Sequence, residues 1–117
     1  MDIREKEKLK QDLIENNIDF VIHLVAMAGF RPSIQNPAYY YDVNITGTMN
    51  LLDLVKKARI KQFIFASNSS LYGNNKKVPF SEEDFVDYPI SPYAATKNLV
   101  SCFAILIIIF MSSTWFV

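Results

Sequence analysis

Glycine and cysteine are both scarce in this chain of 117 residues, which contains three glycines and one cysteine. Gly29, Gly47 and Gly73 are too far apart to form a glycine-rich turn that presents backbone N–H groups to a pyrophosphate. As the single cysteine, Cys102 cannot form an internal disulfide, which fits a reducing compartment. The N-terminal residues lack the apolar core of a secretory signal, so we expect a cytoplasmic protein.

An excess of either charge is also absent, because twelve basic side chains balance twelve acidic ones. No segment gathers lysine and arginine into a surface that would follow a phosphate backbone, so we expect no nucleic-acid partner. The sequence predicts no metal site either. Half of the residues are apolar, which is enough for the core of one small domain.

The apolar pattern predicts a parallel βαβ unit. Residues 2–17 have the spacing of an amphipathic helix, and residues 37–59 have that of a longer one. Residues 21–25 and 62–67 are nearly continuous apolar runs, which is typical of strands buried on both faces. We expect His23, inside the first of these runs, to be a packed residue. Strand, helix and strand with short connections predict a right-handed crossover.

A long loop over residues 68–92 leads to the pair Tyr93 and Lys97. Residues four apart on a helix lie on one face, and a lysine ammonium near a phenol stabilises the phenolate that acid–base chemistry needs. The pair alone is weak evidence, because this spacing occurs by chance. Its position after the second strand strengthens it, since parallel sheets bind ligands beyond the carboxyl ends of their strands.

Four blocks carry a more specific signal: 21-VIHLVAMAGFRPSIQNP-37, 44-NITGTMNLLD-53, 63-FIFASNSSLYG-73 and 90-ISPYAATK-97. In this order and spacing they resemble the extended short-chain dehydrogenase family of nucleotide-sugar epimerases and dehydratases, and most of all the UDP-glucuronate 4-epimerases. The resemblance covers residues 2–97. It implies an α/β fold that is part of a Rossmann-type, doubly wound parallel sheet, with the first βαβ unit and the sugar-binding domain missing.

The resemblance also implies bound NAD and roles for single residues. Tyr93 would remove the proton of the sugar 4-hydroxyl while a hydride passes to the nicotinamide, and Lys97 would hold the nicotinamide ribose. Asn68 occupies the position of the family's catalytic serine or threonine and offers no hydroxyl. UDP-glucuronate is the implied substrate. The implied cofactor contacts are Asp2, Ile3, Leu24, Val25, Ala26, Asn44, Ser67, Tyr93 and Lys97, and the implied substrate contacts are Arg31 and Ser69.

The tail over residues 99–117 contains no charge and includes an isoleucine-rich run. It could be a buried element, a membrane anchor or a translated segment unrelated to the family, and we favour the last. The expected organisation is therefore a partial NAD-binding domain over residues 1–98 followed by the tail. We expect the chain to be inactive alone. The alternatives are a non-catalytic partner of a full-length epimerase, with a homodimer contact through residues 37–59, or a membrane-tethered remnant.

Overall fold

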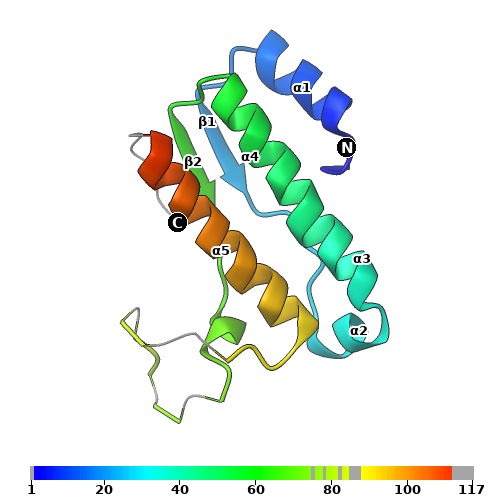
Figure 1. Ribbon diagram of the computed structural model, residues 1–117, viewed down its shortest axis with the longest axis vertical. Helices are drawn as coiled ribbons and strands as arrows, with labels where there is room; N and C mark the ends of the chain where they lie inside the picture. Colours follow the sequence, from blue (N-terminus) through cyan, green and yellow to red (C-terminus); the bar gives the residue numbers. More distant parts are fainter. Residues whose placement is uncertain (1, 75, 78, 82, 85–87, 112–117) are drawn as a thin grey trace.

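The computed structural model describes residues 2–74, 76–77, 79–81, 83–84 and 88–111 (Figure 1). Two strands and a set of helices form these ranges. In chain order the elements are α1 (Lys6–Glu15), β1 (Phe20–His23), α2 (Phe30–Gln35), α3 (Pro37–Tyr41), a π-helical segment (Asp42–Gly47), α4 (Thr48–Lys57), β2 (Gln62–Phe65), a 3-10 turn (Ser69–Tyr72) and α5 (Pro92–Met111).

The strands β1 and β2 pair in parallel, as the βαβ pattern predicted. Phe20 lies opposite Gln62 and His23 lies opposite Phe65, so both strands end at the same edge of the sheet. The backbone N–H of Ala66 extends this pairing by donating to the His23 carbonyl at 3.2 Å. The segments that follow the two strands therefore start side by side.

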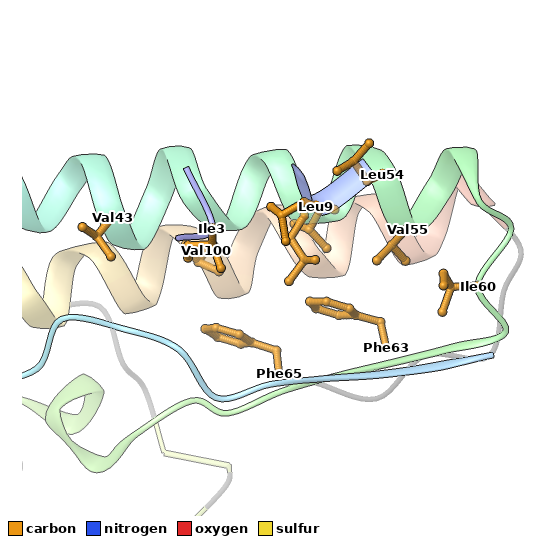
Figure 2. Close-up of a cluster of buried hydrophobic side chains, with 11 residues drawn as sticks. Ile3, Leu9, Val43, Leu54, Val55, Ile60, Phe63, Phe65 and Val100 are labelled. Carbon is orange, nitrogen blue, oxygen red and sulfur yellow. The ribbon is translucent and has the colours of Figure 1, made fainter. Parts of the chain in front are cut away.

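Helices α4 and α5 cover one face of this sheet, and α1 packs along α4 on the side away from α5 (Figure 1). Phe63 and Phe65 point from β2 toward the two helices, where Val100 of α5 joins them (Figure 2). The side chains of this core are at most 7% exposed, and they are Ile3, Leu9, Val43, Leu51, Leu52, Leu54, Val55, Ile60, Phe63, Phe65 and Val100.

The opposite face of the sheet remains open within the described part of the chain. Phe20 and Ile22 of β1 are 61% and 63% exposed, and Ile64 of β2 is 37% exposed. The prediction of strands buried on both faces is therefore wrong for these residues. Successive side chains of a strand point to opposite faces, and only the face that carries Phe63 and Phe65 meets helices.

The predicted long helix over residues 37–59 forms as a continuous run from Pro37 to Lys57 with a wider π-helical turn in its middle. This turn, Asp42–Gly47, buries Val43 and Asn44. A Cβ at Gly47 would lie 2.5 Å from Cγ1 of Ile3, so glycine at this position lets Ile3 enter the core. The turn thus lets the N-terminal segment pack closely against this helix.

Helix α5 begins at Pro92 after Ser91, whose hydroxyl oxygen accepts a hydrogen bond from the backbone N–H of Ala94 at 3.1 Å. A capping serine followed by proline at the first helical position is a favourable start. The helix continues without a break to Met111, and Ala104 is fully buried in it. Residues 112–117 of the tail lie outside the described residues. None of the helices formed by the described residues meets the length and hydropathy needed to span a bilayer.

Shortening a side chain should cost much more stability on the packed face of the sheet than on the open face. Phe63→Ala should destabilise the chain by about 3–5 kcal/mol, because it leaves a cavity in the packed face. Ile22→Ala, on the open face, should change the free energy of unfolding by no more than about 0.5 kcal/mol. Denaturant titration followed by circular dichroism measures both, and equal losses would contradict this assignment of the faces.

Candidate active site

Tyr93, in the first turn of α5, faces the carboxyl end of β2. Its phenolic oxygen accepts a hydrogen bond from Nδ2 of Asn68 at 3.0 Å. On its other side the ring meets the edge of the Tyr40 ring, with centroids 6.3 Å apart and planes at 75°. The structure thus brings together Tyr93 and Asn68, two residues that the sequence assigned to one site from positions twenty-five apart. A donor aimed at the phenolic oxygen stabilises negative charge on it.

Lys97 lies one turn further along α5 and is buried, with 5% of its surface exposed. Its Nζ donates to the Ala66 carbonyl at 2.9 Å and lies 4.6 Å from the centroid of the Phe65 ring. Burial lowers the pKa of this amine from its ordinary value. The segment just beyond β2 therefore contacts both catalytic candidates of α5: Lys97 bonds the backbone of Ala66, and Tyr93 bonds the side chain of Asn68.

A buried polar network joins the loop after β1 to α5. The side-chain oxygen of Asn44 accepts from the backbone N–H of Met27 at 2.7 Å, and its Nδ2 donates to the Met27 carbonyl and to Oγ1 of Thr96, each at 3.0 Å. Thr96 in turn donates to the Tyr93 carbonyl at 2.7 Å. Nearby, the Tyr40 hydroxyl donates to the Ala28 carbonyl at 2.7 Å. The sequence pointed to Asn44 but gave no indication of its partner Thr96.

A pocket of about 290 Å³ lies beside the N-terminal segment. Three predicted cofactor contacts, Asp2, Ile3 and Val25, line this pocket. Tyr39 and Val43, from the helical run that begins at Pro37, complete the lining.

Arg4 holds the carboxylate of Asp2, which lines this pocket, in place. Its guanidinium pairs with Asp2 at 2.6 Å and with Asp42 at 2.7 Å, and its Cζ lies 5.4 Å from the Tyr39 ring centroid. These bonds from Arg4 lower the pKa of the Asp2 carboxyl to about 2. The sequence reading missed Arg4 and Tyr39; a basic residue two positions from Asp2 is a weak local signal, and Asp42 joins them only through the fold.

The other residues predicted to contact cofactor or substrate are more exposed to solvent. Leu24 is 69% exposed, Ala26 is half-buried, and Ser67 and Ser69 are exposed on either side of Asn68. Arg31 is exposed on α2, which packs against α5. Within the described ranges, no side-chain hydrogen bond of these residues assigns them a role, so their contacts with cofactor or substrate stay predictions.

His23 ends β1 beneath this site and is 3% exposed, as expected for a packed residue. Its Nε2 lies 2.8 Å from the hydroxyl oxygen of Thr48, and that hydroxyl donates its single hydrogen to the Asn44 carbonyl at 2.6 Å. The Thr48 oxygen must therefore accept from His23, which places the imidazole proton on Nε2. Burial, assisted by the charge of Lys97, lowers the pKa of His23 to about 4.

Comparison with known proteins places these residues in a family context. The sequence profile of the family described as GDP-mannose 4,6 dehydratase matches residues 1–107. The chain is 48% identical over 98 residues to a UDP-glucuronate 4-epimerase of Thermodesulfobacterium geofontis, a match that covers 84% of this chain and 30% of that protein. It is 53% identical over 79 residues to UDP-glucuronate 4-epimerase 5 of Arabidopsis thaliana, covering 67% of this chain and 18% of the relative.

Solved structures show the same fold. The UDP-glucose 4-epimerase of Bifidobacterium longum, in complex with NAD+ and UDP, matches with a TM-score of 0.93 and 31% identity, over 98% of this chain and 35% of that one. The Thermus thermophilus UDP-glucose 4-epimerase complex with NAD matches with a TM-score of 0.91 and 28% identity, over 98% of this chain and 37% of that one. The predicted partial Rossmann-type fold is confirmed, and the chain spans about a third of the length of these solved structures.

The buried His23 predicts a specific dependence of stability on pH. Its pKa is about 4 in the folded chain and 6.5 in its ordinary state, so between these values the unfolded chain binds the additional proton. Stability should therefore be complete above pH 6.5 and fall as the pH drops toward 4, by up to about 1.4 kcal/mol per pH unit. Denaturant titrations across this window measure the slope.

A His23→Gln variant is the matched control, because it keeps a side-chain N–H for Thr48 and does not titrate. Its free energy of unfolding should vary much less between pH 6.5 and 4. The pKa values of the Asp2, Glu5 and Asp53 carboxyls are also lowered in the folded chain. Their effect on stability lies at lower pH and is the same in both proteins. The same slope in the variant and the parent chain would rule out His23 as its source.

Proposed function

The chain belongs to the NAD-dependent epimerase and dehydratase family, and we propose that it is the catalytic segment of a nucleotide-sugar 4-epimerase acting on UDP-glucuronate. The observation that carries this proposal is the contact between Tyr93 and Asn68 at the carboxyl end of β2, with Lys97 one turn away on the same helix. The similar proteins of Thermodesulfobacterium geofontis and Arabidopsis thaliana are UDP-glucuronate 4-epimerases by name.

In this proposal Tyr93 is the acid–base group. Its phenolic oxygen takes the proton of the sugar 4-hydroxyl during oxidation at C4 and returns it when the 4-keto sugar is reduced on the other face. Asn68, which already donates to that oxygen, stabilises the charge that the oxygen carries between these two transfers. Lys97 adds positive charge from the neighbouring turn, and its donation to the Ala66 carbonyl fixes where that charge lies.

The residues present fit part of an NAD molecule. The pocket formed by Ile3, Val25, Tyr39 and Val43, with the Asp2 carboxylate at its rim, offers apolar surface and an acceptor to the adenine end. Lys97 would contact the nicotinamide ribose. When bound, NAD supplies the group that accepts the hydride from C4 and gives it back. The three glycines of this chain build no pyrophosphate turn, so the middle of the cofactor has no cradle in it.

This shortage of cofactor contacts supports the expectation that the 117 residues are inactive alone. The chain spans about a third of the structures it matches, and one face of its sheet is open. A cytoplasmic location stays a prediction, as does a foreign origin of residues 99–117.

The homodimer through residues 37–59 also stays a prediction. The core uses most apolar side chains of this helix, including Leu52 and Val55. Leu99, Ile105 and Leu106 of α5 are each at least 40% exposed and would offer a dimer more apolar surface.

A chimera tests the proposed chemistry directly. Residues 1–98 should replace the corresponding segment of the Thermodesulfobacterium geofontis epimerase, to which the chain is 48% identical over 98 residues. We expect the chimera to convert UDP-glucuronate to UDP-galacturonate with NAD, and Tyr93→Phe within it to lower kcat by about 10²–10⁴-fold. The 117-residue chain assayed alone should show no conversion. A folded chimera that binds NAD but leaves UDP-glucuronate unchanged would overturn the proposal.

Asn68 gives a second prediction in the same chimera. Asn68→Ser introduces a hydroxyl that can both donate and accept along the path of the proton, so kcat should rise. Asn68→Ala removes the donor to Tyr93 and should lower kcat. Steady-state kinetics of the three proteins should give the highest kcat with serine at position 68, a lower one with asparagine and the lowest with alanine. A serine variant slower than the asparagine parent would show that Asn68 is adapted to this site.

A further inference from the structure

Tyr39 presents an aromatic ring to the pocket beside the N-terminal segment. It lines this pocket together with the smaller apolar side chains of Ile3, Val25 and Val43, and it is 40% exposed. Concave sites with a mostly apolar lining and a few polar groups are typical of small-molecule binding. Among the described residues of this lining, only Tyr39 offers a flat ring to a ligand.

Arg4 and Asn36 hold this tyrosine in place. The Arg4 guanidinium lies over the ring, with Cζ 5.4 Å from the ring centroid, and it pairs with both Asp2 and Asp42. The backbone N–H of Tyr39 donates to Oδ1 of Asn36, the residue that caps α3, at 3.3 Å. Because the ring is held before any ligand arrives, binding costs it little conformational entropy.

The charge around the pocket favours the base of a nucleotide over its phosphate. Among the described residues that line the pocket, only Asp2 is charged. The single cation of Arg4 pairs with two carboxylates, those of Asp2 and Asp42, so this group keeps a net negative charge that repels a phosphate. Adenine offers an amino group to such a carboxylate, whereas uracil places a carbonyl oxygen on either side of its N–H.

We propose that Tyr39 determines which ligand this pocket binds, because its ring stacks against the base of an adenine nucleotide. Stacking on an aromatic side chain grows with the area in contact, so a purine with two rings gains more from it than a pyrimidine. The inference rests on the proposed function only in naming NAD as the source of the adenine nucleotide.

Tyr39 and Tyr41 give a matched pair of substitutions in the 117-residue chain. Both lie on α3 and are 40% and 44% exposed, but Tyr41 is not among the described residues of the lining. Titration with AMP, followed by NMR of chains labelled at the tyrosine rings, measures the dissociation constant. Tyr39→Ala should weaken AMP binding by about 5- to 150-fold, the usual loss when a stacked ring is removed. Tyr39→Phe keeps the ring, so this variant and Tyr41→Ala should bind AMP like the parent chain.

UMP is the comparison ligand, because it carries the same ribose and phosphate on a different base. In the parent chain AMP should shift the Tyr39 ring signals and give a nuclear Overhauser effect between that ring and the adenine protons. UMP at the same concentration should do neither. A folded Tyr39→Ala chain that binds AMP like the parent would overturn the proposal, as would equal responses to UMP or no response of Tyr39 to AMP.

The chimera provides a second measurement of the same role. Tyr39→Ala within it should raise the Kd for NAD by a similar factor, and an unchanged Kd would equally overturn the proposal. None of these binding measurements needs turnover. A chimera that binds NAD through Tyr39 but leaves UDP-glucuronate unchanged would therefore contradict the proposed function alone, and an unchanged Tyr39→Ala variant would contradict this inference alone.

Discussion

The parallel pairing of β1 with β2 is the constraint on which the rest of the structure depends. Parallel strands need a crossover, and here the run from Pro37 to Lys57 supplies most of it. The same pairing ends both strands at one edge, so the loop from Leu24 and the loop from Ala66 start next to each other. The first turns of α5 lie at this edge, where Lys97 bonds Ala66 and Tyr93 bonds Asn68.

The sequence predicted this framework because its signals are local. Apolar periodicity placed both strands and the long helix within one or two residues. The matched blocks brought Tyr93 and Asn68 to one site. Contacts between segments far apart in the sequence leave no such local pattern. Thr96, Arg4 and Tyr39 are ordinary helix or loop residues until the fold places them beside Asn44, Asp2 and Asp42.

Burial was the less predictable property, because it depends on what covers each face. The run around Phe20 and Ile22 reads as a strand enclosed on both sides, yet the described helices lie on one side only. An open apolar face fits a chain that spans about a third of the length of the proteins it matches.

The central claim is that the fold of these residues alone brings Tyr93 and Asn68 together. Nuclear Overhauser effects between the Asn68 side-chain amide and the Tyr93 ring, measured in solution on the 117-residue chain, test it most directly. The account predicts a strong effect and slow exchange of that amide, because the donor lies 3.0 Å from the phenolic oxygen. No such effect in a folded chain, with the amide exchanging as freely as in a short peptide, would contradict it.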